Sequence, residues 1–548
     1  MSGRGPTAEA PPPESSYVVV DPTSELLGQV RRPSRLPWIS IGFLALALLW
    51  LPTLPRLASD AIRPSEAAWI DEALVPETEA RVSAFARQLT RSIWEWQDLT
   101  IEPTERWSPA QRQALRLPAA GASIVALLVL LLLGRVVVGD AASVFAVSLL
   151  AVSRPWIHAG TSFSPLAYGE FLMLLGVLWA ILLQARHREV SVAPVNATRV
   201  GVAGLFLGIG LLLIPAGFAT LVATVLVWFL LGLRRSSSDA TTLPVVRPRH
   251  NTFLAIFGTV VLLSAAVLAL FTVENFAGGS RPPFLSGLSM DRPPDVDLWV
   301  ELYRGVLSPT AGTDRVVVFG LLLMLSIRAI EWFGSRPWQS AGLLPWAFLG
   351  WFLFELTRPE ARGLLRVPVT VPPLFLLGLA WLLLRGLHPG RARRQEYTFL
   401  LVWVLIGVLC APLIPRGHPF EPLLAITVTL LPAVVLTAAR AVRALWEWDR
   451  SVLSRTGVVV LAYAPVAAAW LSGLAERSRP LQEPARVLDA SLGWILLGGV
   501  GLGLVAQITS VRPDPSGPAP NPDARHRRGR GRGGPSRRRT GRRRPQRT

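Results

Sequence analysis

The chain has 548 residues, of which 51% are hydrophobic and only 17% are charged, and its formal net charge is +19 at pH 7. Several apolar runs reach the roughly 20 residues that a helix needs to cross a bilayer, which excludes an ordinary soluble protein. These runs lack the alternation of a membrane barrel, and backbone groups in lipid must be satisfied within helices. The sequence therefore predicts an all-α polytopic integral membrane protein with about 12–14 transmembrane helices.

The chain ends differ in composition from the rest of the sequence. The Pro-, Ser- and Gly-rich arm 1–36 and the tail 511–548 lack the apolar residues of a packed core, so we expect both to be disordered. The tail carries 12 arginines between residues 524 and 548 and no acid in that stretch. Attraction to anionic membrane lipid is favoured over RNA binding, and nucleic acid is not an expected partner.

The region 37–510 is predicted to be the membrane domain. Its first apolar run, 38–54, follows RRPSR and lacks a cleavage site of small residues, so we expect a retained helix. Arginine-rich short loops place both termini in the cytoplasm, which leaves the long segments 55–117 and 274–314 outside. Further spans are predicted near 118–138, 141–157, 165–184, 200–216, 217–234, 252–273, 315–332, 341–357, 369–387, 397–414, 421–443, 456–474 and 488–508, giving 14 in total.

The first outer segment, 55–117, contains a predicted amphipathic helix. Pro76 precedes it and acids cluster in its first turn, as at many helix starts. Its apolar residues recur at helical spacing: Val82, Phe85, Leu89, Ile93 and Trp96. We expect this helix to lie at the outer membrane surface, with Trp94 and Trp96 at headgroup depth and the sequence WIDEA leading into it.

Four motifs, in their order along the chain, resemble the GT-C superfamily of polyprenyl-phosphate-sugar-dependent membrane glycosyltransferases. The nearest branch is that of protein mannosyltransferases and lipid A aminoarabinose transferases. The motifs are WIDEA at 69–73, the stretch 115–160 that begins LRLP and contains an LGR turn, the paired apolar run 204–231, and LIPRGHPFEPLLAITVTLLPAVVLTAARAV at 413–442.

This resemblance implies transfer of a hexose or pentose from a polyprenyl-phosphate donor to a glycan, lipid or protein acceptor. The reaction would occur at the outer face of the inner membrane of a bacterium. The first-loop acid of the family would fall on Asp71, or alternatively on Glu72, with Trp69 beside the substrate. A carboxylate at that place can take the proton of an acceptor hydroxyl as the anomeric carbon becomes cationic.

The departing lipid phosphate needs a cation beside it. Arg366, Arg416 and His418 are expected at outer helix ends and are candidates for this role. For the two arginines, the competing interpretation is a side chain that snorkels at a helix mouth. For Asp71 and Glu72, it is a pair that stabilises a helix start through the macrodipole.

One motif departs from the family. Where many members carry SQEARPYA, this chain has GTSFSPLA at 160–167, so Ser162 replaces the acid and Ser164 the arginine. Glu170 lies deeper and is predicted to bind substrate, because acids at membrane depth are costly and usually functional. No metal site is predicted, and the need for a divalent cation stays open. The two serines favour the alternative function, an inactive GT-C-like scaffold or lipid-linked-sugar carrier.

Overall fold

The computed structural model describes residues 38–50, 52–74, 84–96, 108–189, 197–227, 343–356, 367–386, 394–410, 422–448, 451–476 and 478–510, together with residues 262, 297 and 300. All regular secondary structure in these residues is helical, which confirms the all-α prediction. The predicted arm 1–36 and tail 511–548 lie outside the described residues, and so, apart from those three single residues, do the predicted spans 252–273 and 315–332 and the segment 274–314.

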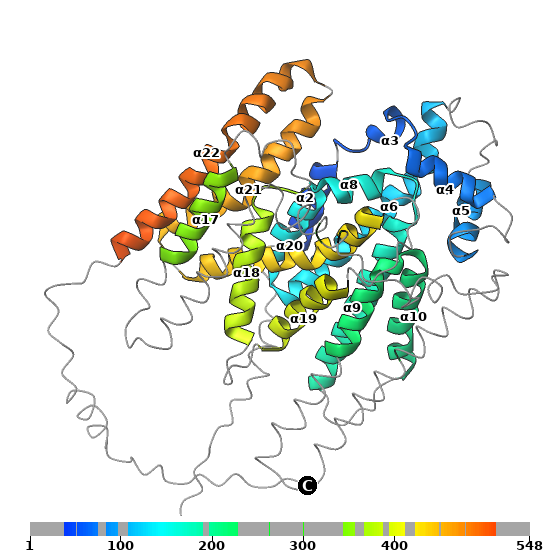
Figure 1. Ribbon diagram of the computed structural model, residues 1–548, viewed down its shortest axis with the longest axis horizontal. Coiled ribbons are helices and arrows are strands. Elements are labelled where there is room, and N and C mark those ends of the chain that lie inside the picture. Colours follow the sequence, from blue (N-terminus) through cyan, green and yellow to red (C-terminus); the bar gives the residue numbers. More distant parts are fainter. Residues whose placement is uncertain are drawn as a thin grey trace, which may run out of the picture.

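Figure 1 shows the described helices from the blue N-terminal to the orange C-terminal elements. In chain order they are α2 (Trp38–Trp50), α3 (Arg56–Ser59), α4 (Pro64–Leu74), α5 (Ala84–Trp96), α6 (Pro109–Val137), α7 (Asp140–Ala151), α8 (Arg154–Thr161), α9 (Leu166–Glu189), α10 (Ala197–Leu213), a 3₁₀ turn (Pro215–Gly217) followed by an apolar helix (Phe218–Val227), α17 (Leu343–Leu356), α18 (Val371–Gly386), α19 (Arg394–Cys410), α20 (Pro422–Trp448), α21 (Val452–Ala475) and α22 (Arg479–Ser510).

The described helices include several that match a bilayer in length and composition. Four are long and apolar enough to cross one, namely α6, α20, α21 and α22, and the bent pair α7 and α8 makes a possible fifth. Shorter apolar helices, such as those in α9, α10 and α18, accompany them. Twelve of the 14 predicted spans coincide with described helices. The chain is therefore a multi-pass membrane protein.

Helix α6 begins at a well-formed cap. The hydroxyl of Ser108 accepts a bond from the backbone N–H of Gln111 at 3.3 Å, and the Gln111 side chain accepts one from the Ser108 N–H at 2.8 Å. Pro109 occupies the first turn, where its missing N–H costs nothing. The cap adds residues 109–117 to the predicted span, so that α6 has 29 residues and extends about 43 Å.

The span predicted at 141–157 is broken in the structure. Helices α7 and α8 meet at 152–153 with an angle of 66° between them. Pro155 lies in the first turn of α8, where its ring and its missing N–H prevent a continuous helix from running through from α7. The predicted span thus coincides with a bent pair of helices, and α8 is turned toward the beginning of α9.

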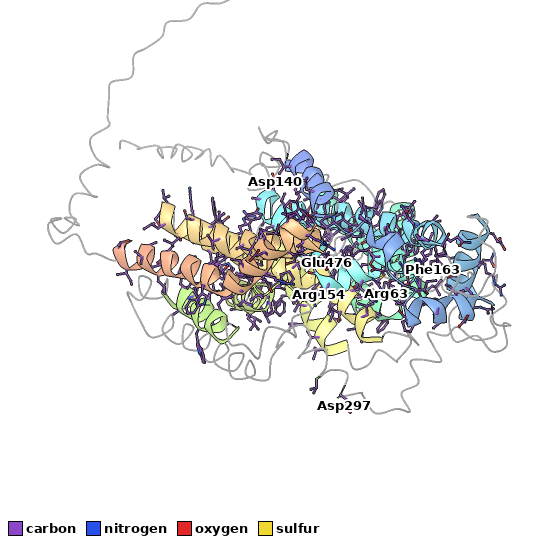
Figure 2. The ribbon with its side chains drawn as sticks, turned by 90° about the horizontal axis from the view of Figure 1, so that it is seen from above. Arg63, Asp140, Arg154, Phe163, Asp297 and Glu476 are labelled. Atoms are coloured by element: carbon purple, nitrogen blue, oxygen red, sulfur yellow. The ribbon has the colours of Figure 1, made fainter. Side chains whose placement is uncertain are left out.

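Helix α20 is buried nearly all round and lies within the bundle between α18 and α7 (Figure 1). Such a helix carries small and aliphatic residues on every side, as α20 does at Ala433, Val435, Leu436 and Ala438. Helix α9 lies against both α6 and α10. Seen from above in Figure 2, α21 and α22 extend away from α4 and α5 to the other side of the molecule.

Long-range polar contacts distinguish the two ends of the bundle. At the end where α6 and α9 begin, which we call the α4 end, Arg56 forms an ion pair with Glu476 after α21. At the opposite end, Arg135 pairs with Asp140 at 2.7 Å, and Arg443 donates to the carbonyl oxygen of Val138. The segment α3–α5 thus lies at one end of the bundle, together with α8 and the start of α9.

Candidate functional site

Helix α4 carries the WIDEA sequence and is a helix in its own right. Its sequence begins at Pro64, and a carboxylate oxygen of Glu66 accepts a bond from the backbone N–H of Arg63 at 2.9 Å. A first-turn glutamate that accepts from the residue before the helix satisfies one of the free N–H groups of the helix start. WIDEA thus lies inside α4, and residues 75–83, through which it was expected to enter the amphipathic helix, lie outside the described residues.

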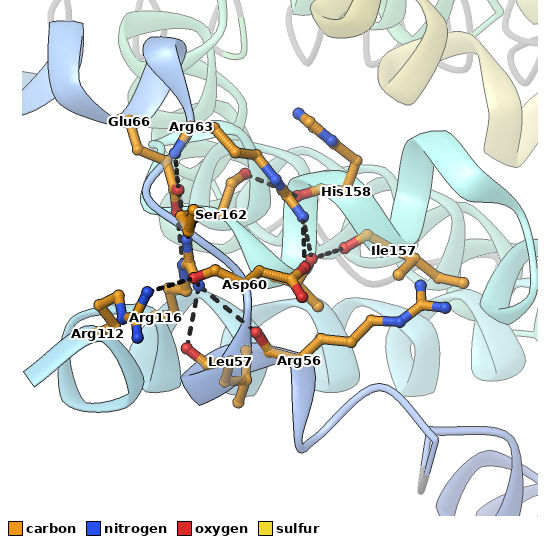
Figure 3. Close-up of polar contacts among 12 residues, drawn as sticks. Arg56, Leu57, Asp60, Arg63, Glu66, Arg112, Arg116, Ile157, His158 and Ser162 are labelled. Carbon is orange, nitrogen blue, oxygen red and sulfur yellow. Dashed lines mark hydrogen bonds and ion pairs between the residues drawn. The ribbon is translucent and has the colours of Figure 1, made fainter. Parts of the chain in front are cut away.

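A buried ion pair fixes α4 to α6 (Figure 3). Arg116 donates to both carboxylate oxygens of Glu66, from Nε at 2.8 Å and from Nη2 at 2.6 Å, and each side chain is only 1% exposed. The backbone N–H of Phe163, in the turn before α9, donates to the same carboxylate at 2.8 Å. Glu66 therefore joins α4, α6 and the turn before α9 at one point.

The remaining donors of Arg116 are also satisfied. Its guanidinium donates to the carbonyl oxygens of Leu57 at 3.1 Å, Asp60 at 3.0 Å and Ala61 at 2.9 Å. A buried charge pair is tolerated only when its other hydrogen-bonding groups are satisfied as well. The arginine therefore holds the chain of residues 57–61 against α6, in addition to α4 itself.

The protonation of Glu66 follows from these contacts. Burial by itself raises the pKa of the Glu66 carboxyl, but the hydrogen bonds and positive charge of Arg116 and the N–H groups of Arg63 and Phe163 outweigh burial and hold its pKa below the ordinary value of 4.5. Glu66 is thus an ionised carboxylate whose oxygens are already engaged. It is a poor candidate for a catalytic base.

Asp71 and Glu72, the predicted catalytic acids, lie in the second half of α4. The helix-start interpretation is therefore wrong, because the acid in the first turn is Glu66. The Asp71 side chain is exposed, and within the described part of the chain it has no ion pair or hydrogen bond. The side chain of Glu72 lies outside the described residues. Asp71 is thus open to a molecule approaching from water.

A small cavity lies between α4, α5 and the start of α9, and we call it the α4–α9 cavity. Its volume is about 10 Å³. The lining side chains are uncharged and mostly apolar or aromatic: Trp69 of α4, Leu89, Thr90 and Ile93 of α5, and Phe163, Ser164, Pro165 and Tyr168 at the start of α9. The predicted amphipathic helix is therefore present as α5, and its apolar residues Leu89 and Ile93 face this cavity. The side chains of Trp94 and Trp96 lie outside the described residues.

Two hydroxyl groups of the α4–α9 cavity lack hydrogen-bond partners in the described part of the chain. They are the Oγ of Ser164 and the phenolic OH of Tyr168, and both atoms are buried. A buried hydroxyl without a partner costs about 1–3 kcal/mol. Ser162 differs, because its hydroxyl donates to the carbonyl oxygen of His158 at 2.7 Å. Of the two serines that replace the family's charged residues, Ser162 stabilises the end of α8 and Ser164 lines the cavity.

Glu170 lies deeper in the bundle. Its side chain is 1% exposed and falls on the same buried face of α9 as Leu166, Met173 and Val177. Among the described residues, its Oε2 has no hydrogen-bond partner, and Glu170 does not line the α4–α9 cavity. The structure therefore brings Trp69 to the cavity but does not bring Asp71 and Glu170 together.

One cationic side chain, Arg63, binds α8. Arg63 donates to the carbonyl oxygen of His158 at 3.2 Å and to the hydroxyl of Thr161 at 3.3 Å, and it pairs with Asp60 at 3.5 Å (Figure 3). Figure 2 labels Arg63 and Phe163 on the side of the molecule that holds α4 and α5. The predicted phosphate-binding candidates lie outside the described residues, namely Arg366, Arg416 and His418.

The sequence predicts no metal site, and this absence stays a prediction. Within the part of the chain that the structure describes, His, Cys, Asp and Glu side chains form no group of three that could hold a metal ion.

The sequence analysis did not single out Glu66, Arg116 or Tyr168 as site residues. A signal existed for Arg116, because a single arginine just before the apolar run of α6 calls for a buried partner.

The chain is similar to a few solved structures, all at low identity. No protein-family profile and no curated protein matches the chain. The structure is similar to the oligosaccharyltransferase of Archaeoglobus fulgidus in its apo form, with 14% identity, 84% of this chain and 56% of that chain covered, and a TM-score of 0.43. The same archaeal protein, AglB, was solved with an inhibitory peptide and a dolichol-phosphate, and matches with 12% identity, the same coverage and a TM-score of 0.43.

A second similar protein is ArnT from Cupriavidus metallidurans, solved bound to undecaprenyl phosphate. It matches with 15% identity, 86% of this chain and 77% of that chain covered, and a TM-score of 0.39. AglB and ArnT are both GT-C glycosyltransferases, the superfamily that the sequence motifs resemble. The chain spans about half (56%) of the length of the archaeal oligosaccharyltransferase.

Proposed function

We propose that this chain is a membrane glycosyltransferase that moves a sugar from a polyprenyl-phosphate donor to an acceptor hydroxyl at the α4 end of the bundle. We assign this end to the outer face of the cytoplasmic membrane of a bacterium, as the arginine distribution predicts. The order of the four sequence motifs supports this class of reaction. Dolichol phosphate and undecaprenyl phosphate, to which AglB and ArnT were solved bound, belong to the same class of lipid carrier.

The observation that carries the proposal is that one helix, α4, carries both the exposed Asp71 and Trp69, a wall residue of the α4–α9 cavity. Other walls of this cavity carry the hydroxyls of Ser164 and Tyr168, which have no hydrogen-bond partner among the described residues. Sites for small molecules typically combine apolar and aromatic walls with a few polar groups that fix orientation. An aromatic wall with two hydroxyls, on a helix that also carries an accessible carboxylate, can contact part of a sugar while its ring stays outside the cavity.

In this proposal the carboxylates of α4 have separate tasks. Glu66 is bound by Arg116 and holds the helix in place. Asp71 is free to accept the proton of the acceptor hydroxyl, while the hydroxyl oxygen bonds to the anomeric carbon. The bond between that carbon and the phosphate breaks, and the polyprenyl phosphate leaves with the electron pair. Glu72 is the alternative base, Glu170 a further substrate-binding candidate, and Arg366, Arg416 and His418 are candidates to stabilise the phosphate.

The test compares Asp71→Asn with Asp489→Asn, which changes an exposed aspartate on α22. In a strain that lacks the gene, the unused polyprenyl-phosphate sugar should accumulate, as measured by mass spectrometry of the lipid extract. The wild type and Asp489→Asn should remove it, and Asp71→Asn should lower the rate of removal by about 100-fold or more, the contribution of a general base. Full activity of Asp71→Asn in the membrane would contradict the assignment.

A second candidate function is a scaffold or lipid-linked-sugar carrier without transferase activity. One observation favours it: Ser162, at the family's acidic position, uses its hydroxyl for the backbone of α8. An unchanged pattern of polyprenyl-phosphate sugars in the deletion strain would support the scaffold and contradict the transferase.

A further inference from the structure

The geometry points to the α4–α9 cavity as a subsite for one neutral primary hydroxyl group, the hydroxymethyl arm of a hexose. This inference rests on the proposed function for its choice of a sugar as the ligand. It narrows the donor or acceptor sugar, for which the sequence allows a hexose or a pentose. Three properties of the cavity lead to it: its two unsatisfied hydroxyls, its lack of charge and its size.

The hydrogen-bonding groups of the cavity fit a hydroxyl ligand. Ser164 is 7% exposed, and its Oγ and the phenolic OH of Tyr168 each lack a partner in the described part of the chain. Ser164 lies in the turn before α9 and Tyr168 in the first turn of α9, and both residues line the cavity. Each of these groups can donate one bond and accept others. One hydroxyl placed between them can accept from one and donate to the other, which removes the cost of both.

The walls select a neutral group. Among the residues that the structure describes, no charged side chain lines the cavity. The buried charges of the adjacent Glu66–Arg116 pair neutralise each other, and Glu66 also accepts from the backbone N–H of Phe163, whose side chain is part of the cavity wall. An ammonium or carboxylate substituent would therefore lose its hydration without gaining a partner, which is far more costly than burying a hydroxyl. Amino sugars and uronic acids charged at this position are excluded.

The size of the cavity favours an exocyclic group. About 10 Å³ is close to the smallest volume that accommodates one water-sized group, so a whole sugar ring does not fit. A ring hydroxyl brings its neighbouring ring atoms with it as it approaches. The hydroxyl of a hydroxymethyl arm extends one bond further from the ring and can enter alone. Trp69 and Phe163 then remain available as apolar walls for the carbon that carries it.

An ordered water in the cavity is the competing explanation, because one water could also bond to Ser164 and Tyr168. The two explanations differ in ligand dependence. A structural water leaves the protein indifferent to whether a sugar has a hydroxymethyl arm. A hydroxymethyl subsite makes a hexoside bind more tightly than the pentoside that lacks only this arm.

The experiment measures binding of simple glycosides to the full-length protein in lipid nanodiscs. The probes are octyl β-D-glucopyranoside, octyl β-D-xylopyranoside without the arm, and octyl β-D-glucuronide with a carboxylate in its place. Affinities are obtained by saturation-transfer NMR at concentrations below micelle formation. We expect the glucoside to bind about tenfold or more tightly than the other two, the effect of leaving buried polar groups unpaired.

Matched variants test whether the preference for the glucoside arises in the α4–α9 cavity. Ser164→Ala and Tyr168→Phe should each weaken glucoside binding about tenfold, to the level of the xyloside. Ser162→Ala, whose hydroxyl bonds to His158, and Tyr463→Phe, on α21, should leave it unchanged. Equal affinities for glucoside and xyloside in the wild-type protein, or unchanged glucoside binding in both cavity variants, would show a structural water only and overturn the inference.

The experiments distinguish failure of the subsite inference from failure of the transferase proposal. Glucoside selectivity that depends on Ser164, found in a protein that leaves polyprenyl-phosphate sugars unchanged, would retain the subsite and remove the transferase proposal. Asp71-dependent transfer without any preference between the glucoside and the xyloside would retain the transferase proposal and remove the subsite.

Discussion

Glu66 of α4 and Arg116 of α6 lie 50 residues apart in the chain and form an ion pair in which both side chains are 1% exposed. The pair does more than join two helices. Through Phe163 it reaches the turn before α9, and through Leu57, Asp60 and Ala61 it reaches the segment that follows α2. The walls of the α4–α9 cavity therefore depend on one charge pair for their relative positions.

Removing one partner of this pair should strongly destabilise the protein. Arg116→Met leaves the Glu66 carboxylate buried without its counter-charge, and we expect a loss of about 3–5 kcal/mol. The measurement is the thermal unfolding temperature in detergent, followed with the fraction of protein that remains monodisperse. The double variant Glu66→Leu with Arg116→Met should recover part of the loss, because it leaves no unpaired buried charge.

A surface ion pair supplies the control. Arg56 and Glu476 join α3 to the end of α21, with side chains 25% and 58% exposed. Glu476→Gln should change stability by no more than about 1 kcal/mol. A loss as large as that of Arg116→Met would contradict the argument that burial determines the cost.

The stability of the protein should also depend on pH through Glu66. The folded-state pKa of Glu66 lies below its ordinary value of 4.5, so its contribution is complete above that value and is lost as the pH falls through the folded-state pKa. Between about pH 6 and pH 3, the unfolding temperature of the wild type should fall more steeply than that of Glu66→Gln. Parallel curves for the two proteins would show that Glu66 does not contribute in this way.

Glu170 should behave differently from Glu66, because its Oε2 lacks a partner in the described part of the chain. A neutral side chain of the same shape costs less to bury than a carboxylate. Glu170→Gln should therefore preserve or raise the unfolding temperature. Glu170→Ala leaves a cavity on the buried face of α9 and should lower stability by about 2–4 kcal/mol. If both variants were equally destabilising, a specific interaction of the carboxylate would be indicated.

The close contact between α21 and α22 can be tested at a glycine. A Cβ atom at Gly457 would collide with the backbone carbonyl oxygen of Gly499, whereas one at Gly498 would meet open space. Gly457→Ala should separate the two helices and destabilise them by about 1–3 kcal/mol. Gly498→Ala should be neutral or slightly stabilising, since alanine is the better helix former. The readout is again the unfolding temperature, and equal effects of the two substitutions would contradict this packing.

The sequence predicted where helices occur better than how they meet. Long apolar runs determine membrane helices almost by themselves, so the predicted spans at 118–138 and 456–474 match α6 and α21. Periodicity also predicted that Leu89 and Ile93 share one face of α5. It could not show that this face lines a cavity against the start of α9, because an apolar face packs equally well on lipid or on protein.

The candidate site was predictable only in part. Trp69 was expected beside the substrate and does line the cavity, whereas Glu66 was passed over although it lies three residues earlier in α4. A partner 50 residues away produces no local pattern, so the pairing of Glu66 with Arg116 could not be read from spacing. The bend between α7 and α8 had a local cause in Pro155, but hydropathy averages over it.

The contacts of α2 and α3 with the end of α21 have a consequence for the insertion of the chain into the membrane. The indole N–H of Trp470 donates to the carbonyl oxygen of Leu48 at 2.8 Å, and Glu476 pairs with Arg56. These partners of α2 and α3 thus follow them by more than 400 residues in the chain. Until α21 has been made, lipid or an insertase must cover this part of the α2–α3 surface.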